Sequence, residues 1–332
     1  MSSATGSTYS GMFESNVKQG YGILLHPLGK YSGHFLNDAK EGEGTLIFND
    51  ASSYNGGFKE NQFHGKGTLC TKENTVYVGD WYGGLKNGQG CETYADGRIY
   101  SGGFQDGQRS GAGALYKNSG GDVIYSGSWL NGIFHGEGTC SYQQVEVQGN
   151  MDPSEPSENN KELRYQGSFF NGLRHGYGVL TNDPDGLVLK GQWHKNMPNH
   201  GKWRIEYQDG RIYSGGAKVK EGMLPVSESR DKDQSIPIPI PMTTDSSKSE
   251  APLVIDTFEI VMPSPHGFGA LRYSNGDVYI GKFQNGTRMG LGALFISGGV
   301  KLEGTWKNDK LVLDNTVSTQ TEDSDIHSGS YS

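Results

Sequence analysis

Aromatic residues and glycines alternate along this chain with a period of two. In residues 125–129, YSGSW, Tyr, Gly and Trp occupy every second position, and such alternation places them on one face of a β-strand. Gly follows two residues after each of nine repeat-starting tyrosines: Tyr9, Tyr31, Tyr54, Tyr77, Tyr100, Tyr125, Tyr165, Tyr213 and Tyr279. An aromatic residue follows four residues after eight of them: Phe13, Phe35, Phe58, Trp81, Phe104, Trp129, Phe169 and Phe283. Leu189 and Leu302 begin two further units, each with Trp four residues later.

A turn and a second strand are predicted after each aromatic strand. Asn-Gly and Asp-Gly pairs tolerate the positive φ angles of a type I′ hairpin. Such pairs follow four of the strands: Asp106-Gly107, Asn131-Gly132, Asn171-Gly172 and Asn285-Gly286. The second strand begins at a Gly-x-Gly sequence, as in residues 65–67 and 136–138. Each unit therefore predicts a β-hairpin, and successive units predict a meander.

The stretch YSGSWLNGIFHGEGT, residues 125–139, resembles the MORN repeat (membrane occupation and recognition nexus), whose pattern is Y-x-G-x-W-x-x-G-x-x-H-G-x-G. The resemblance covers most of residues 9–311. It implies an all-β fold, an elongated single-layer antiparallel sheet of consecutive β-hairpins in which each repeat adds two strands. Proteins of this kind generally act as scaffolds and adaptors, often at membranes, cytoskeletal structures or cilia. Each repeat would be stabilised mainly by its neighbours.

Departures from the repeat predict the domain boundaries. Residues 1–8 are expected to be a disordered N-terminus, and 9–223 an array with an acidic loop insertion at about 145–164. Residues 224–252 are rich in Ser and Pro and predict a flexible linker. C-terminal units and a terminal strand are expected over 253–311, with VIDTFEIV (254–261) as the first strand of the unit completed at 266–269. An acidic disordered tail is predicted for 312–332.

An apolar Ile-Pro run, IPIPIP at 236–241, lies within the predicted linker. Two interpretations stay open for it. Either it packs back on the sheet or remains solvated, or it docks a partner as a segment of polyproline II type.

Composition narrows the class of protein. Hydrophobic residues make up 33% of the chain and aromatic residues 11%, while 52 residues are Gly, which favours a thin sheet packed by aromatic rings. A net charge of −8 without a long Lys/Arg run disfavours nucleic acid as a partner and attachment to acidic membranes by charge alone. Three cysteines without CxxC spacing indicate a reducing compartment. The first residues lack the apolar core of a secretory signal, so a cytoplasmic protein is expected.

Histidine recurs beside the Gly-x-Gly sequences: His64, His135, His175, His200 and His266. Successive units would lie roughly 10 Å apart, whereas zinc needs donor atoms at about 2.0–2.1 Å, so neighbouring repeats are not expected to share a metal. Local hydrogen bonding is the expected role of these rings. The GxxxxGK[ST], GxSxG and HExxH patterns are also missing from the sequence. We therefore predict no enzyme, no cofactor, no metal site and no catalytic residue.

The aromatic face of the best-formed repeats is the predicted partner-binding surface. Because a single-layer sheet has no second layer to cover it, part of this face could contact a protein. The alternative is that the rings pack on each other to hold the sheet together. The candidate residues are Tyr54, Phe58, Tyr77, Trp81, Tyr100, Phe104, Tyr125 and Trp129.

The tail contains one short motif, VSTQT at residues 317–321. Thr319, Gln320 and Thr321 resemble the peptides that add a strand to the dynein light-chain hub protein. The basic residue that often precedes such peptides is missing here.

Two functions are consistent with these observations. The first is a non-catalytic scaffold or adaptor that binds proteins through the aromatic face, with a ciliary, axonemal or other cytoskeletal setting suggested by the resemblance alone. The alternative is a membrane-associated adaptor that binds phosphoinositides. This alternative requires Lys and Arg to cluster on one face, whereas they are scattered along the sequence.

Overall fold

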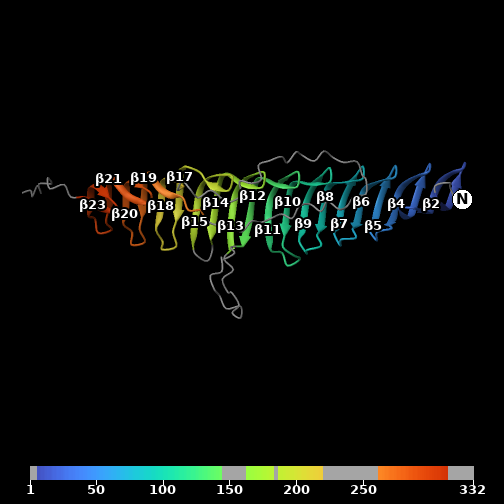
Figure 1. Ribbon diagram of the computed structural model, residues 1–332, viewed down its shortest axis with the longest axis horizontal. Helices are drawn as coiled ribbons and strands as arrows, with labels where there is room; N and C mark the ends of the chain where they lie inside the picture. The colour runs from blue at the N-terminus through green and yellow to red at the C-terminus, as the bar shows by residue number, and fades with distance from the viewer. Residues whose placement is uncertain (1–5, 144–161, 183–185, 220–260, 313–332) are drawn as a thin grey trace, which may run out of the picture. The chain divides into compact units, whose positions relative to one another are not determined.

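A computed structural model describes residues 6–143, 162–182, 186–219 and 261–312 (Figure 1). Strands and turns make up these residues, and they include no helix. Consequently the described chain has no helix able to span a membrane. The Ile-Pro run, the tail motif at Thr319, Gln320 and Thr321, and nearly all of the acidic insertion lie outside the described residues. The predictions made for those segments stay untested.

The described strands belong to two compact units. In the first unit each strand from β1 to β15 pairs antiparallel with the next along the chain, and β15 also pairs with β16. The strands are β1 Thr8–Glu14, β2 Val17–His26, β3 Gly29–Leu36, β4 Ala39–Phe48, β5 Ser53–Lys59, β6 Gln62–Cys70, β7 Val76–Tyr82, β8 Leu85–Thr93, β9 Ile99–Gln105, β10 Gln108–Tyr116, β11 Val123–Leu130, β12 Ile133–Gln143, β13 Glu162–Phe170, β14 Leu173–Asn182, β15 Leu187–His194 and β16 Met197–Pro198. The predicted succession of antiparallel hairpins is confirmed.

The second unit continues the same pattern with seven strands. They are β17 Gly201–Glu206, β18 Ile212–Lys218, β19 Ser264–Arg272, β20 Val278–Gln284, β21 Thr287–Phe295, β22 Lys301–Lys307 and β23 Lys310–Val312. Strand β19 lies between β18 and β20, with Gly269 opposite Gly215 on one side and Gly281 on the other. Both edges of β19 are thus paired, and residues 254–260, which were expected to supply a strand beside it, lie outside the described residues. The aromatic strand β18, which carries Tyr213, therefore pairs with β19, more than 40 residues later in the sequence.

Glycines occupy two distinct positions in each hairpin. The Gly after the repeat tyrosine pairs with the second Gly of the Gly-x-Gly sequence, as Gly79 pairs with Gly90. The first Gly of that sequence, here Gly88 with φ +100°, lies where the register shifts and forms a β-bulge. The first Gly of the Gly-x-Gly sequence therefore adopts a positive φ angle. The two paired glycines leave space above the sheet for a side chain.

The hairpin turns have the predicted geometry. Both central residues have positive φ, as at Asn131 (φ 50°) and Gly132 (φ 80°), which is the signature of a type I′ turn. Five hairpins adopt the same turn without glycine: Ser15-Asn16, Asn37-Asp38, Glu60-Asn61, Lys195-Asn196 and Asn308-Asp309. Sequence reasoning missed these five because it relied on the Asn-Gly and Asp-Gly pairs.

Each hairpin turn is bonded to the hairpin before it. The amide of Gly132 donates to the carbonyl oxygen of Arg109 at 2.9 Å, and the amide of Gly172 donates to that of Phe134 at the same distance. Where the second turn residue is Asp, its side chain also accepts a hydrogen bond, as Asp38 Oδ1 does from the amide of Lys18 at 2.9 Å. Successive repeats are therefore coupled at their turns, as expected for stability that depends on nearest neighbours.

The two faces of the sheet carry different residues. We call the side that bears the repeat tyrosines the aromatic face. The opposite side, which bears the intervening positions such as Val78 and Asp80, is called the open face. Alternation along each strand fixes this division.

Candidate functional site

Within each unit, the rings of the aromatic face form a ladder of edge-to-face contacts. Tyr77 contacts Trp81 of its own strand with ring centroids 5.1 Å apart, and Phe104 of the next repeat at 5.0 Å. Tyr100 makes the equivalent contacts with Phe104 and Trp129. Such T-shaped pairs add about 0.5–1.5 kcal/mol beyond the burial of their area. Each repeat tyrosine except Tyr213, whose own strand has Ala217 at this position, is therefore held between the aromatic ring of its own repeat and that of the repeat that follows.

Each tyrosine ring also lies directly over a pair of glycines. A Cβ atom on Gly90 would lie 2.5 Å from the ring of Tyr77, so only glycine fits beneath it. The hydroxyl of Tyr77 donates to the carbonyl oxygen of Asp80 at 2.9 Å. Burial raises the pKa of these phenols, that of Tyr100 to about 12. The hydroxyls are thus structural donors, because their hydrogen bonds end on the main chain of their own strand.

All eight residues predicted to contact a partner through this face are buried. Tyr54, Phe58, Tyr77, Trp81, Tyr100, Phe104, Tyr125 and Trp129 expose between 0% and 5% of their surface. Their role as partner contacts stays a prediction, but this burial favours the structural role that sequence reasoning held open. The edge-to-face ladder explains the burial, because each ring is covered by the next repeat and needs no second layer.

A residue that sequence reasoning missed covers the tyrosine ring from the side of the hairpin turn. It lies nine residues after the tyrosine, and we call it the lid position. Phenylalanine stacks on the tyrosine at two lids, with Phe63 3.7 Å from Tyr54 and Phe134 3.8 Å from Tyr125 between ring centroids. Cations occupy six others: Lys18, Lys40, Lys86, Arg109, Arg174 and Arg288.

The choice of cation at the lid follows the aromatic residue of the next repeat. Arginine occurs where that residue is Trp, and its guanidinium lies over the indole: Arg109 over Trp129 at 4.6 Å, Arg174 over Trp193 at 4.6 Å and Arg288 over Trp306 at 4.4 Å. Lysine occurs at the three lids that precede Phe, namely Lys18, Lys40 and Lys86. A planar guanidinium stacks on a large ring in a way that a compact ammonium does not. The regular nine-residue spacing was the sequence signal for this position.

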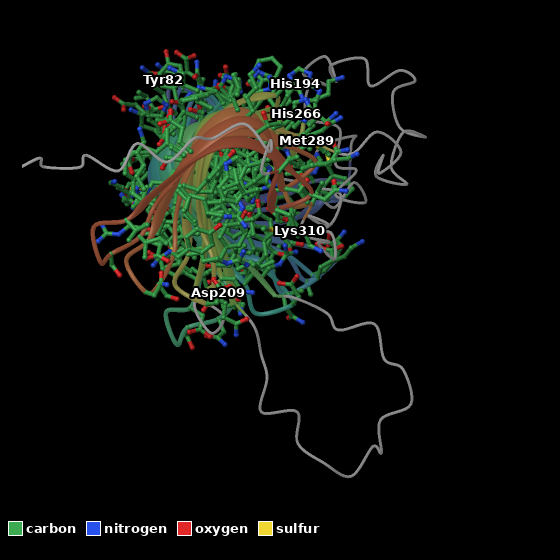
Figure 2. All side chains as sticks on the ribbon, turned by 90° about the vertical axis from the view of Figure 1, so that its left-hand side faces the viewer. Tyr82, His194, Asp209, His266, Met289 and Lys310 are labelled. Atoms are coloured by element: carbon green, nitrogen blue, oxygen red, sulfur yellow. The ribbon has the colours of Figure 1, made fainter. Side chains whose placement is uncertain are left out.

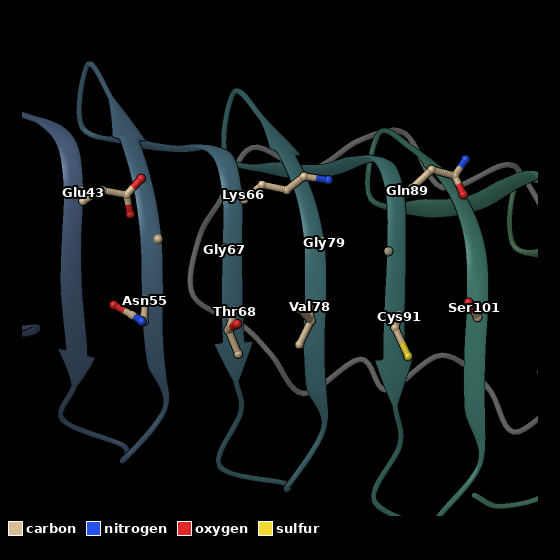
Figure 3. Close-up of a pocket in the computed structure, with 12 residues that line it drawn as sticks. Glu43, Asn55, Lys66, Gly67, Thr68, Val78, Gly79, Gln89, Cys91 and Ser101 are labelled. Atoms are coloured by element: carbon tan, nitrogen blue, oxygen red, sulfur yellow. The ribbon is translucent and has the colours of Figure 1, made fainter.

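The open face carries a shallow groove across β4–β9 (Figure 3). It has a volume of about 570 Å³, and its lining includes backbone at Gly67, Gly79 and Gly90. Lys66 and Asp80 form an ion pair at 2.5 Å, while the other Asp80 oxygen accepts the amide of Gln89 at 2.8 Å. The groove is shallow, and its titratable lining residues, Glu43, Lys66 and Cys91, come from three separate strands, so it has the character of a contact surface.

An exposed apolar row lies on the open face at the hairpin ends of the first unit. We define the hairpin-end row as Leu130 and Ile133 of one hairpin with Phe170 and Leu173 of the next, which are 36–53% exposed. Leu130 pairs with Ile133, and Phe170 pairs with Leu173. The two pairs are adjacent, because Ile133 Cγ2 lies 3.2 Å from where a Cβ on Gly172 would be. Sequence reasoning did not identify this row.

The family model for the MORN repeat matches the chain nine times. The matched residues are 9–27, 31–53, 54–74, 77–97, 100–121, 125–144, 165–183, 265–278 and 279–300, more than half of the sequence. The chain belongs to the MORN-repeat family. The ladder of Tyr and Trp or Phe over paired glycines is thus the structural form of its MORN motif, and the predicted resemblance is confirmed.

Other comparisons add little to the family match. No curated protein matches the chain. The TCP domain of SAS-4 (dCPAP) of Drosophila melanogaster, in complex with a proline-rich motif of Ana2 (dSTIL), is 9% identical over 80% of this chain and 90% of that chain, with a TM-score of 0.24. The TCP10 domain of Danio rerio CPAP, in complex with a STIL peptide, is 9% identical over 90% and 99%, with a TM-score of 0.22. BamB from Moraxella catarrhalis is 9% identical over 86% and 88%, with a TM-score of 0.15. Scores this low do not extend the likeness beyond general strand content.

The hairpin pattern continues where the MORN model does not match. Leu189 is fully buried in place of the repeat tyrosine, and Trp193 donates its Nε1 hydrogen to the carbonyl oxygen of Gly178 at 3.2 Å. Trp306 does the same toward Gly292 at 3.0 Å. Its strand β22 also has a short second partner, β23 Lys310–Val312, at the end of the described chain. The hairpin geometry of the MORN repeat therefore continues in units whose sequence does not match the family model.

The lid cations change one argument drawn from the sequence. Basic residues that are scattered in the sequence occupy the same position of their repeats on the aromatic face, because the MORN spacing brings them there. Several of them are paired with carboxylates: Lys18 with Asp38, Lys86 with Glu92 and Arg288 with Asp309. They also lie over aromatic rings, so these cations differ from a free basic patch of the kind that binds acidic lipid.

The histidines of the MORN units lie on the open face. His64 contacts Tyr82, and His135 contacts Phe170, with ring centroids 5.3 and 5.4 Å apart. Within the described residues no group of three or more His, Cys, Asp or Glu side chains could hold a metal ion. The three cysteines are free thiols, of which Cys140 is buried.

Proposed function

We propose that this protein is a non-catalytic scaffold that binds other proteins along the open face of its MORN array. The hairpin-end row carries this proposal. Its four apolar side chains are exposed although the repeat does not require apolar residues there. In the hairpin β9–β10 the same two positions are Gln105 and Gln108, and in β5–β6 they are Lys59 and Gln62. Packing of the ladder therefore does not explain the row, whereas contact with a partner does.

Because the aromatic face is buried, we propose that the partner contacts the open face and not the aromatic face. Rings such as Tyr77 and Trp129 hold neighbouring repeats together and are buried, whereas the hairpin-end row on the open face stays 36–53% exposed. An apolar row flanked by polar residues is the usual composition of a protein-binding patch. The partner is accordingly proposed to be a protein with a complementary apolar surface.

The cellular setting belongs to the same proposal. A cytoplasmic protein in a ciliary, axonemal or other cytoskeletal assembly is what the MORN resemblance suggests. A phosphoinositide-binding adaptor is less well supported, because the aligned lid cations lie over rings and several pair with carboxylates. The repeats fill the described chain, and we propose no enzymatic activity for them.

Affinity capture from native extract, quantified by mass spectrometry, tests the scaffold. The variant carries Leu130→Gln and Phe170→Gln, and the matched control carries Gln105→Ala and Gln108→Ala at the equivalent turn region. Thermal unfolding of all three proteins establishes that the variants are folded. We expect partners that the parent and the control capture and that the variant loses. Capture of the same proteins by all three would refute a contact at the hairpin-end row.

Liposome co-sedimentation at physiological salt tests the membrane alternative separately. Vesicles that contain phosphoinositide would be compared with neutral vesicles. We expect equal and low binding to both. A preference for the phosphoinositide vesicles would revive the lipid adaptor, irrespective of the capture result.

A further inference from the structure

A histidine on the open face of one repeat faces a fixed position of the next repeat. That facing residue lies five residues after the start of its repeat, at the end of the aromatic strand. Tyr82 faces His64, and Phe170 faces His135. The third pair differs, because His175 of β14 faces His194 of β15, with ring centroids 5.0 Å apart and ring planes inclined at 54°. Two imidazoles are therefore side by side on adjacent strands.

The separation of these rings matches that of two imidazoles on one metal ion. A zinc–nitrogen bond of about 2.0–2.1 Å places each ring centre about 3.2 Å from the metal. Two such rings are then about 4.5 Å apart at a right angle and about 5.2 Å apart at the tetrahedral angle. The observed 5.0 Å lies between these values.

Both rings are accessible and carried by regular structure. His194 is exposed, and its side chain projects away from the sheet (Figure 2); His175 is partly exposed. Their strands pair at the adjacent position, Gly176 opposite Trp193, which fixes the two backbones. On its other side His175 contacts Phe170 at 5.7 Å. The pair is thus preorganised on two strands, which favours a bidentate ligand.

We propose that His175 and His194 form a binding site for one divalent transition-metal ion of the late first row, for which zinc is the probe. Imidazole nitrogen is a preferred ligand of these ions. Two coordination positions come from the protein, and water or a donor atom of another molecule fills the others. The site consequently resembles an open metal site more than a closed structural one.

The sequence alone did not indicate this site. Equivalent histidines of successive repeats are too far apart to share an ion. The antiparallel register instead brings together two non-equivalent positions, one on the second strand of a repeat and one on the first strand of the next. The inference is independent of the proposed scaffold function.

Isothermal titration of the full chain with zinc chloride tests the site. The principal variant is His194→Phe, which reproduces the pairing seen between His135 and Phe170 and so preserves the packing. His175→Ala removes the other ligand, and His135→Ala is the matched control. We expect one zinc ion to bind the parent and the control equally. Loss of one imidazole should weaken binding about tenfold or more, because the second ligand acts at high effective concentration.

A stability readout separates metal binding from an effect on folding. Zinc should raise the melting temperature of the parent and the His135→Ala control by mass action, and should do so less for His194→Phe. Parent-like zinc affinity in His194→Phe would overturn the proposal. So would a parent that binds zinc no more tightly than a double variant lacking both imidazoles.

Discussion

The indole Nε1 of Trp129 donates a hydrogen bond to the carbonyl oxygen of Gly113 in the preceding repeat, at 3.0 Å. The same ring contacts Tyr100 of that repeat and lies under the guanidinium of Arg109. The Trp129 side chain thus joins two repeats through a hydrogen bond, an aromatic contact and a cation–π contact.

Truncation of this ring should destabilise the array. We expect Trp129→Ala to lower the free energy of unfolding by about 3–5 kcal/mol, because it removes a large buried side chain. Trp129→Phe should cost about 1 kcal/mol, since it loses the hydrogen bond while Phe104 shows that the ring position accepts phenylalanine. Urea denaturation followed by tyrosine fluorescence measures both. An unchanged midpoint for Trp129→Ala would show that the ring is exposed, in favour of the aromatic-face binding site.

A methyl group beneath a tyrosine should be poorly tolerated. Gly90→Ala places a Cβ 2.5 Å from the ring of Tyr77, which is itself buried, so the strand or the ring must shift. We expect a loss of about 1–3 kcal/mol in the free energy of unfolding. Gly298→Ala is the matched control, because nothing lies within 4 Å of its added Cβ. Equal melting temperatures for the two variants would contradict the packing described for the tyrosine.

The lid position should accept phenylalanine in place of arginine. Phe63 already covers Tyr54 beside Trp81, the same arrangement of rings that surrounds Arg109. Arg109→Phe should therefore stay within about 1 kcal/mol of the parent, whereas Arg109→Ala should lose about 2 kcal/mol of packing and cation–π contact. Chemical denaturation of the two variants provides the comparison. If Arg109→Phe proved the less stable of the two, the lid would depend on charge and not on coverage of the ring.

Alkaline pH should unfold the protein through its tyrosines. Burial raises the pKa of Tyr100 and that of Tyr213 to about 12, against an ordinary value of 10. The folded state therefore holds these protons more tightly, and the resulting stability is fully present below pH 10 and is lost as pH rises from 10 toward 12. Absorbance at 295 nm should show phenol ionisation coincident with loss of the β-sheet circular dichroism. Tyr100→Phe should reduce this pH dependence, and full ionisation with the sheet intact would contradict it.

Local geometry was predictable from the sequence because it depends on neighbouring residues. Alternation of Tyr125, Gly127 and Trp129 fixes a strand with one aromatic face, and Asn131-Gly132 specifies a type I′ turn. The register follows, since the paired glycines are the places where the tyrosine ring can lie. The fold class was therefore correctly predicted, and so was the family.

The burial of the aromatic rings, the lid position and the histidine pair could not be predicted in the same way. They depend on contacts between repeats, which the repeat pattern does not show. Trp129 is buried by Tyr100 and Arg109 of the preceding repeat. The sequence of one repeat considered by itself therefore does not show that the ring is covered. The lid position was missed because the residues that occupy it differ in chemistry from repeat to repeat. Phe134 and Arg109 nevertheless both cover the tyrosine ring of their repeat. The histidine pair required the register between β14 and β15, which sets two unlike positions side by side.

The ladder of rings also gives the array a direction. Each tyrosine is covered by the aromatic residue of the repeat that follows it, as Tyr279 is by Trp306. The strand that carries Trp306 has Leu302 at the tyrosine position, and so it presents no tyrosine for a following repeat to cover. Lengthening by duplication is thus asymmetric. A unit that follows a tyrosine strand has a phenol to cover, whereas a unit that follows such a Leu strand has none, as is also the case after Leu189.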